Sequence, residues 1–292
     1  MISSEEQQRR YKDKLVTTLK AFDVICKEND IKYYACGGTA IGAVRHNGII
    51  PWDDDIDVCM LKPDYDRFMA LKEKIKQYNY QIIDYHDNGY YLPYAKFIDT
   101  RTTLWEVVEY ECVIGAFIDI FPLYYTVEDV DVNLKIWKKY IKTFEKYALG
   151  IRKFDYSGFF YAIKGFHLGI IRDYIRGGCF YKFMQKKSKA NFDKLVCELS
   201  KNKGNRLMNF YTFYPVKKEI LKVQWFESQI EFPFEDTTIM LPNGYREYLA
   251  QLFGDYMTPP PVEKRTTHHQ HFYLDLDRHL TLAEIKRMKH GK

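Results

Sequence analysis

The sequence predicts an α+β fold, in which a mixed β-sheet is backed by helices and a helical segment is inserted before the C-terminal part. Apolar residues recur at helical spacing near the N-terminus and again beyond residue 129. Short apolar and aromatic runs alternate with helices up to residue 121. An order of helix, strand, helix, strand, helix and then several strands is typical of a mixed sheet with helices packed on it.

The N-terminal part supplies the expected sheet. Leu15, Leu19, Phe22 and Ile25 share one helical face, so residues 4–29 predict an amphipathic helix. A further helix is expected to begin at Pro63, because proline suits the first turn of a helix. Strands are expected at residues 31–36, 55–60, 80–83, 93–98, 103–109 and 116–121, with a short helix at 40–45.

The chain changes texture after residue 123. Helices are expected at residues 129–150, through most of 156–201 and at 244–253, and strands at 223–226, 230–234 and 238–241, followed by a proline-rich loop and a basic tail. We therefore divide the chain into a catalytic core at 1–128, a helical aromatic and basic insertion or lid at 129–222, and a C-terminal part at 223–292 that completes the same active site.

Composition limits the classes of function. Charged residues make up 28% of the chain and the net charge is +5, which suits a phosphate-rich ligand or an anionic membrane surface and does not indicate nucleic acid. The first twenty residues are polar and charged, unlike the apolar region of a signal peptide. Charged residues interrupt the apolar stretch 159–183, so we do not expect it to span a bilayer. None of the six cysteines forms a Cys-x-x-Cys pair. We expect a cytoplasmic protein with reduced thiols.

An acidic run, Pro51-Trp52-Asp53-Asp54-Asp55-Ile56-Asp57, is the clearest chemical signal. On a strand alternate side chains share a face, so Asp55 and Asp57 should project together, with Asp53 just before them and Asp54 turned away. Carboxylates on one face repel each other unless a cation joins them, and hard oxygen ligands favour Mg²⁺, Mn²⁺ or Ca²⁺. A solvated acidic loop is the alternative, but the apolar residues within the run favour a partly buried strand.

Paired glycines in Gly37-Gly38-Thr39 lie between an expected strand and the short helix. Glycines allow the backbone to approach a ligand closely, and a helix N-terminus offers free N–H groups to a phosphate. A simple turn is the commoner explanation, but the acidic run that follows favours a phosphate site beside a cation.

Asp119 lies within the apolar run 117–122. A carboxylate there is costly unless it has a partner. It is either a hydrogen-bonded structural residue or a further metal ligand from a neighbouring strand, and the sequence context favours the second interpretation.

The stretch from Gly37 to Asp57 resembles the signature of the LicD family, which includes bacterial phosphocholine transferases and, as distant relatives, the fukutin-related proteins. Residues 117–123 resemble the second block of that family. A third resemblance, to the C-terminal block of the family, is carried by Gly254-Asp255-Tyr256-Met257 with Pro259-Pro260, Arg265 and His268.

The resemblance implies a nucleotidyltransferase-like fold, a donor such as CDP-choline or another CDP-alcohol, and Mg²⁺ or Mn²⁺. Asp55 and Asp57 match the metal-binding carboxylates of the family, Asp119 matches the position of a further acid, and Asp53 is expected to contribute to the metal site. We expect Asp55, Asp57 and Asp119 to be catalytic.

Several other residues are candidate substrate ligands. Arg45 and His46 suit donor phosphate contacts, with helix C-terminal cations as the alternative. Lys96 and Arg101 flank an expected strand end. Each is either a ligand of the donor diphosphate or a solvated charge on the surface. The expected substrate-binding residues are Gly37, Gly38, Thr39, Arg45, His46, Trp52, Lys96, Arg101, Arg265 and His268.

Histidines near the C-terminus do not predict a metal site. His268, His269 and His271 lack the spacing of a helical zinc pair, and a polar loop is the commoner explanation. The resemblance to the C-terminal block of the family implies that His268 and Arg265 close over the donor.

The aromatic and basic stretch 156–189 has two interpretations. It forms either core helices with a cationic outer face or a platform for a lipid-linked or glycan acceptor near the inner face of the membrane. The first is the commoner outcome, and the second allows a peripheral membrane contact.

The expected function is metal-dependent transfer of phosphocholine, or a related phospho-alcohol, from a CDP-linked donor to a hydroxyl of a cell-surface glycan or its lipid-linked precursor. A nucleotidyltransferase that releases pyrophosphate would use the same acids. A non-catalytic glycan- or nucleotide-binding protein on this fold is the third interpretation, which the intact acid set disfavours.

Overall fold

A computed structural model describes residues 5–153, 156–175, 182–265 and 271–290. Within these ranges eight strands form one sheet, in the order β1-β2-β5-β4-β10, with β3 also paired to β4 and β6–β7 extending from β5. Strands β2 and β5 run parallel and the other pairs are antiparallel. The strands of this sheet are β1 Tyr34–Ala35, β2 Asp57–Leu61, β3 Tyr80–Ile83, β4 Ala95–Trp105, β5 Ile114–Thr126, β6 Arg206–Met208, β7 Leu221–Lys222 and β10 Tyr273–Asp275.

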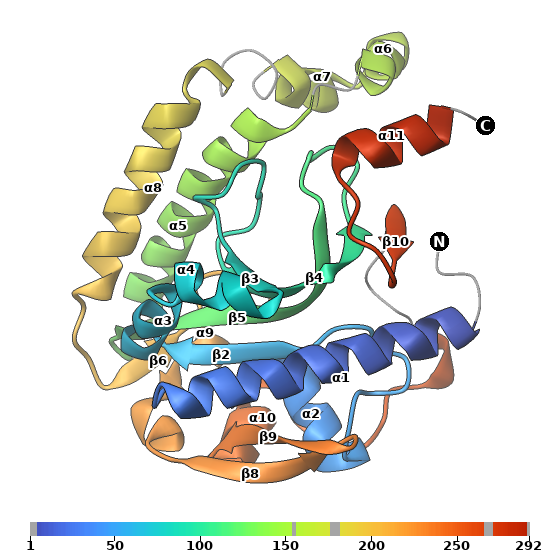
Figure 1. The fold of residues 1–292 in the computed structure, drawn as a ribbon. Helices are drawn as coiled ribbons and strands as arrows, with labels where there is room; N and C mark the ends of the chain where they lie inside the picture. Colours follow the sequence, from blue (N-terminus) through green and yellow to red (C-terminus); the bar gives the residue numbers. More distant parts are fainter. Residues whose placement is uncertain (1–4, 154–155, 176–181, 266–270, 291–292) are drawn as a thin grey trace.

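Helices cover both faces of this mixed sheet (Figure 1). Helices α5 and α8 lie on one face, and α1, α2, α10 and the hairpin of β8 and β9 lie on the other. The helices are α1 Glu5–Glu28, α2 Gly37–His46, α3 Lys62–Met69, α4 Lys72–Ile75, α5 Val130–Ile151, α6 Tyr156–Lys164, α7 Leu168–Ile175, α8 Gln185–Ser200, α9 Val216–Glu219, α10 Tyr245–Phe253 and α11 Leu282–His290, and the hairpin strands are β8 Gln229–Phe234 and β9 Thr237–Pro242. The expected α+β class is confirmed.

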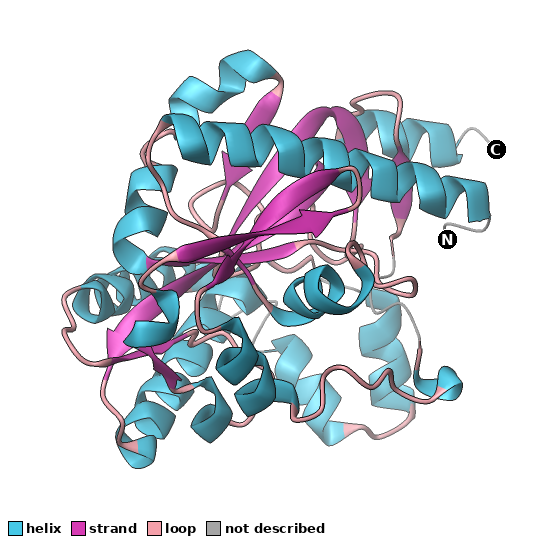
Figure 2. Cartoon of the chain, turned by 90° about the horizontal axis from the view of Figure 1, so that it is seen from below, coloured by secondary structure: helices cyan, strands magenta, loops and turns pink. Residues whose placement is uncertain are grey.

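Two hydrophobic cores lie on opposite faces of the sheet. Phe97 and Ile118 join the core that α1 covers, whereas Ile98 and Phe117, their chain neighbours, join the core of α5 and α8. This division follows from the alternation of side chains along a strand. Figure 2 shows the long helix α1 crossing its face of the sheet.

Some expected boundaries are wrong. The two strands expected at 93–98 and 103–109 form the single strand β4, and residues 223–226 form a 3₁₀ helix rather than a strand. The basic tail contains β10 and α11, and β10 pairs with β4. Short amphipathic pieces such as these acquire their conformation from distant partners, which local patterns do not contain. No helix in the described ranges is both long enough and apolar enough to span a bilayer.

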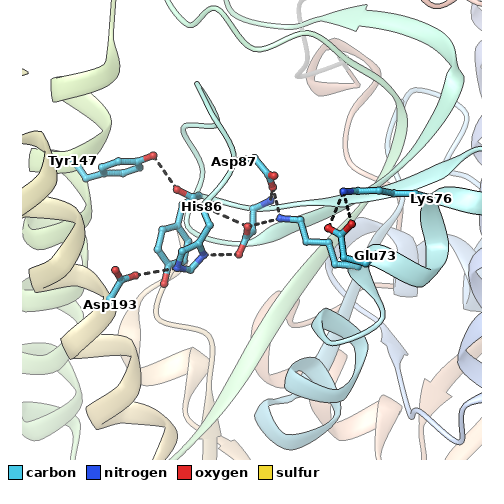
Figure 3. Close-up of polar contacts among 9 residues, drawn as sticks. Glu73, Lys76, His86, Asp87, Tyr147 and Asp193 are labelled. Atoms are coloured by element: carbon cyan, nitrogen blue, oxygen red, sulfur yellow. Dashed lines mark hydrogen bonds and ion pairs between the residues drawn. The ribbon is translucent and has the colours of Figure 1, made fainter.

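A polar cluster joins the end of β3 to α4 and α8 (Figure 3). His86 lies between two carboxylates, with Nδ1 2.8 Å from Asp84 Oδ2 and Nε2 3.2 Å from Asp193 Oδ1. The hydrogen bond to Asp84 raises the pKa of His86. Burial alone would raise the pKa of Asp84, but His86 and Lys72 outweigh it and lower that pKa to about 2. The cluster thus ties the sheet to the helical segment.

A buried carboxyl lies on α9. Glu219 is 6% exposed and accepts a hydrogen bond from the Thr212 hydroxyl at 2.7 Å. Burial raises the pKa of Glu219 to about 7, although the hydrogen bond opposes the shift. Folding therefore favours the protonated carboxyl.

Truncation of Phe97 should strongly destabilise the fold. Its ring stacks on Tyr80 at 4.9 Å between centroids and contacts Phe22 at 5.6 Å. Because the side chain is fully buried, Phe97→Ala should lower the free energy of unfolding by about 3–5 kcal/mol in urea denaturation. Tyr78→Ala, at a half-exposed ring, should change it by less than about 1 kcal/mol. Equal losses in the two variants would contradict the packing described.

Stability should fall as pH rises from 4.5 to about 7 through Glu219. Below the ordinary pKa of 4.5 the carboxyl is protonated in both states. Above it the unfolded chain releases the proton while the folded chain retains it, so up to about 3 kcal/mol is lost by pH 7. Glu219→Gln should remove this loss, and the exposed Glu28→Gln should not. Urea denaturation across this pH range would refute the assignment if the two variants behaved alike.

Candidate active site

Three charged side chains stand in one row across the sheet. Asp57 on β2 pairs in register with Asp119 on β5, and Asp119 pairs in register with Lys96 on β4. Residues opposite each other on neighbouring strands project from the same face, so the three side chains are adjacent. Lys96 Nζ lies 2.8 Å from Asp119 Oδ1.

The middle of this row is a buried ion pair. Lys96 and Asp119 are 1% and 3% exposed, so the surface-charge interpretation of Lys96 is wrong. Glu106 Oε2 lies 3.5 Å from Lys96 Nζ, and the Tyr94 hydroxyl donates to Asp119 Oδ2 at 3.5 Å. Burial lowers the pKa of Lys96, but Asp119 and Glu106 outweigh it and the pKa is raised. The ammonium therefore remains charged at neutral pH, as a buried ion pair requires.

Asp57 lies in strong negative potential. Burial raises its pKa well above the usual range, and the carboxylates of Asp55, Asp119 and Asp53 raise it further, while Lys96 opposes them. Each added carboxylate makes the charged form of its neighbours costlier. The charges of the other three acids therefore act on Asp57, and added positive charge would lower this repulsion.

The paired glycines are part of α2 rather than a turn before it. The helix begins at Gly37, whose φ of +55° favours glycine. A Cβ on Gly38 would lie 2.6 Å from Asp53 Oδ2, so any other residue here would displace that carboxylate. Thr39 Oγ1 accepts a hydrogen bond from the Asp57 N–H at 2.8 Å. The positive end of α2 thus faces the acids.

The acidic run itself is mostly not a strand. Strand β2 begins at Asp57, and residues 53–56 form an extended segment before it. The strand expected from residue 55 therefore begins two residues later, and Asp54, expected to turn away, lines the neighbouring cavity with Asp53. Lys12 on α1 holds the preceding loop by donating to Pro51 O at 2.9 Å and Ile50 O at 3.3 Å. The loop before Asp53 is therefore held by α1, which is distant in the sequence.

The donor set fits a hard divalent cation. Asp53, Asp55, Asp57 and Asp119 offer only carboxylate oxygens, and burial together with their mutual repulsion raises the pKa of Asp57. Within the described ranges no three His, Cys, Asp or Glu side chains group closely enough to enclose a metal ion by themselves. Mg²⁺ is commonly held by one or two carboxylates together with substrate phosphates and water, so this geometry suits an ion completed by its substrate.

A cavity of about 1080 Å³ opens beside the row. Two other cavities in the described part of the chain measure about 280 and 330 Å³ and lie away from the acids. The large cavity is lined by Asp119 and Lys96, by the acids Glu106 and Glu109, and by several aromatic rings. These rings are Tyr11, Tyr91, Tyr94, Tyr211, Phe213 and Phe272.

Sequence reasoning missed most of this lining. The rings come from segments that the sheet brings together, and no local motif marks them. Glu106 carried one available signal, because it is an acid within the strand expected at 103–109; in the structure it directly follows β4, the strand that carries Lys96.

A second cluster forms where the first motif meets the C-terminal block. The guanidinium groups of Arg45 and Arg265 lie 6.0 and 4.8 Å from the Trp52 ring centroid, and His46 contacts that ring edge-on at 5.9 Å. Arg45 also donates to Tyr256 O at 2.6 Å. Burial and then Arg45 and Arg265 lower the pKa of His46. Four of the expected substrate-binding residues are therefore neighbours, at the opposite end of α2 from Gly37.

The remaining candidates lie elsewhere. Arg101 pairs with Asp99 at 2.8 Å, donates to the Tyr80 hydroxyl at 2.9 Å, and is not part of the cavity lining. Its contacts match the surface-charge interpretation. His268 lies outside the described residues, as does His269, whereas His271 is buried and its ring packs against Tyr11 at 5.1 Å.

Comparisons with known proteins show which family the sequence resembles. Residues 30–163 match the family described as LicD/FKTN/FKRP, nucleotidyltransferase domain. The lipopolysaccharide cholinephosphotransferase LicD of Haemophilus influenzae is 28% identical over 273 residues, which are 86% of this chain and 91% of that protein. Uncharacterised proteins of Rickettsia typhi and Rickettsia prowazekii are 35% and 33% identical over 85 residues, 27% of this chain and 28% and 32% of theirs. Residues 30–163 therefore belong to the LicD/FKTN/FKRP nucleotidyltransferase family, and the chain is a distant homologue of the Haemophilus protein over most of its length.

Proposed function

We propose that this protein transfers phosphocholine, or a related phospho-alcohol, from a CDP-linked donor to a hydroxyl of a cell-surface glycan or its lipid-linked precursor. The observation that carries the proposal is the row of Asp57, Asp119 and Lys96 beside a cavity large enough for a substrate. The name of the Haemophilus relative supports the choice of phosphocholine and lipopolysaccharide chemistry.

Asp55 and Asp57, with Asp53 and Asp119, would hold Mg²⁺ or Mn²⁺. When bound, such an ion supplies charge neutralisation for the diphosphate of the donor. The first turn of α2 offers the Gly38 N–H and the positive end of the helix to the same phosphates, while the Gly37 N–H donates to the Tyr248 hydroxyl at 3.4 Å.

Asp119 is the proposed proton acceptor. Lys96 and Tyr94 hold its carboxylate, and it lines the cavity where an acceptor hydroxyl would lie. As the hydroxyl oxygen forms its bond to the distal phosphorus, its proton passes to Asp119. The bond from that phosphorus to the bridging oxygen breaks, and CMP leaves. Positioning and charge stabilisation would supply most of the rate, as in phosphoryl transfer generally.

The cavity lining suits a cationic alcohol such as choline. Glu106 and Glu109 line the cavity together with the aromatic rings of Tyr91 and Tyr211. Aromatic faces and carboxylates are the groups that bind a quaternary ammonium. A neutral polyol would gain little from these rings.

Asp57→Asn and Asp119→Asn should each abolish transfer. With CDP-choline, Mg²⁺ and an acceptor glycan, kcat/KM should fall about a thousandfold or more, because charge stabilisation or the proton acceptor is lost. Chromatography should identify CMP as the product. Asp30→Asn is the matched control, since Asp30 is exposed and its φ of +52° is one that asparagine tolerates. Release of pyrophosphate from CTP instead of CMP would replace this proposal with nucleotidyl transfer.

Gly38→Ala should reduce turnover without weakening the fold. The added Cβ would meet Asp53 Oδ2 at 2.6 Å and displace that carboxylate. Because Asp53 would then be misplaced relative to the other acids, kcat should fall by about a hundredfold. The free energy of unfolding should change by less than about 1 kcal/mol. Gly169→Ala, where nothing lies within 4 Å of the new Cβ, should leave both unchanged. Full activity of the Gly38 variant would show that the placement of Asp53 is unimportant.

A further inference from the structure

The hairpin of α6 and α7, with the start of α8, exposes large apolar side chains. We call this the hairpin surface and define it as residues 159–175 and 182–189. Phe166, Leu168 and Phe183 are 84%, 76% and 87% exposed. Phe160, Tyr161, Ile163, Ile170 and Ile175 are exposed as well. These side chains are therefore not the core of a helical layer, which was the commoner expectation for this segment.

Phe166, at the tip of the hairpin, has a backbone conformation that is unfavourable for an aromatic residue. Phe166 connects α6 and α7 with a φ of +54°, and its N–H donates to Ile163 O at 3.1 Å. Glycine or asparagine would adopt this conformation with less strain. Strained positions of this kind concentrate at functional sites. Packing within the hairpin therefore does not account for the exposed ring.

Basic residues accompany the exposed rings. The hairpin surface contains six Lys or Arg and a single acidic residue, Asp173. The basic residues are Lys164, Arg172, Lys182, Lys186, Lys187 and Lys189. Helices that combine apolar rings with Lys and Arg bind in the interface of anionic bilayers. Protein interfaces are depleted in Lys, which makes up five of these six cations, so a lipid surface fits the composition better than a protein partner.

We propose that the hairpin surface binds an anionic lipid bilayer. The exposed rings would enter the interfacial layer while the lysines contact lipid phosphates. Figure 1 shows α6 and α7 past the end of α5, near the start of α8 and away from the sheet.

A chain of contacts connects the hairpin surface to the cavity. Glu109 lines the cavity, and Arg152 at the end of α5 lies 3.3 Å from its carboxylate. The Lys153 N–H donates to Glu109 O at 2.7 Å, and the Arg152 guanidinium lies 6.0 Å from the ring centroid of Tyr174 on α7. Docking would therefore hold this wall of the cavity near the bilayer, where a lipid-linked acceptor is found. The docking itself does not depend on the proposed reaction.

Vesicle sedimentation with the full chain tests the proposal. The protein should bind vesicles of equal parts phosphatidylcholine and phosphatidylglycerol, release in high salt, and bind vesicles of phosphatidylcholine alone far more weakly. Lys182→Glu with Lys187→Glu should weaken binding to the anionic vesicles about 20-fold or more. Phe166→Ser with Leu168→Ser should weaken it about tenfold or more.

Matched controls separate this surface from general charge and hydrophobicity. Lys135→Glu with Lys138→Glu, on exposed positions of α5, changes the net charge equally, and Val24→Ser with Tyr78→Ser removes exposed apolar groups elsewhere. Both should bind vesicles as the unaltered protein does. Equal losses in controls and hairpin variants, or no binding of the unaltered protein, would overturn the proposal. Self-association that Phe166→Ser with Leu168→Ser abolishes, without vesicle binding, would assign the surface to a second copy of the chain.

Discussion

The register between β2, β5 and β4 is the constraint on which the site depends. It places Asp57, Asp119 and Lys96 side by side on one face of the sheet. A shift of one residue in either pairing would turn Asp119 or its neighbours into the opposite core, which contains Ile118 and Ile120. The apolar alternation of β5 therefore fixes the chemistry of the site as well as its packing, because one register satisfies both.

Charge balance is the second requirement of this row. Asp119 is buried and needs a cation nearby, which Lys96 supplies at 2.8 Å. The pKa of Asp57 rises through burial and through repulsion from Asp55, Asp119 and Asp53, which Lys96 only partly offsets. The two halves of the row thus differ: one is an ion pair, and the other is a carboxylate held beside further carboxylates.

Segments far apart in the chain complete the surroundings of the row. Lys12 on α1 holds the loop before the acids, and β10 pairs with the far edge of β4 and places Phe272 in the cavity lining. The segment after β4 carries Glu106 and Glu109 into the same cavity and meets Arg152 at the end of α5. The helical segment between β5 and β6 is therefore attached to the cavity wall, which gives the hairpin surface a structural route to the site.

Local pattern was sufficient for the fold class, for α1, α5, α10 and the β8–β9 hairpin, and for the motif Gly37 to Asp57, because periodicity and motif residues are properties of neighbouring positions. It could not decide where Lys96, Arg101 and Arg45 would lie, since one charged side chain near a strand or helix end suits either a site or the surface. Strand pairing buried Lys96 against Asp119, β4 held Arg101 beside Asp99, and the C-terminal block drew Arg45 to Trp52 and Tyr256. The aromatic cavity and the exposed hairpin surface likewise arise only in the tertiary structure, because burial depends on partners that are distant in the chain.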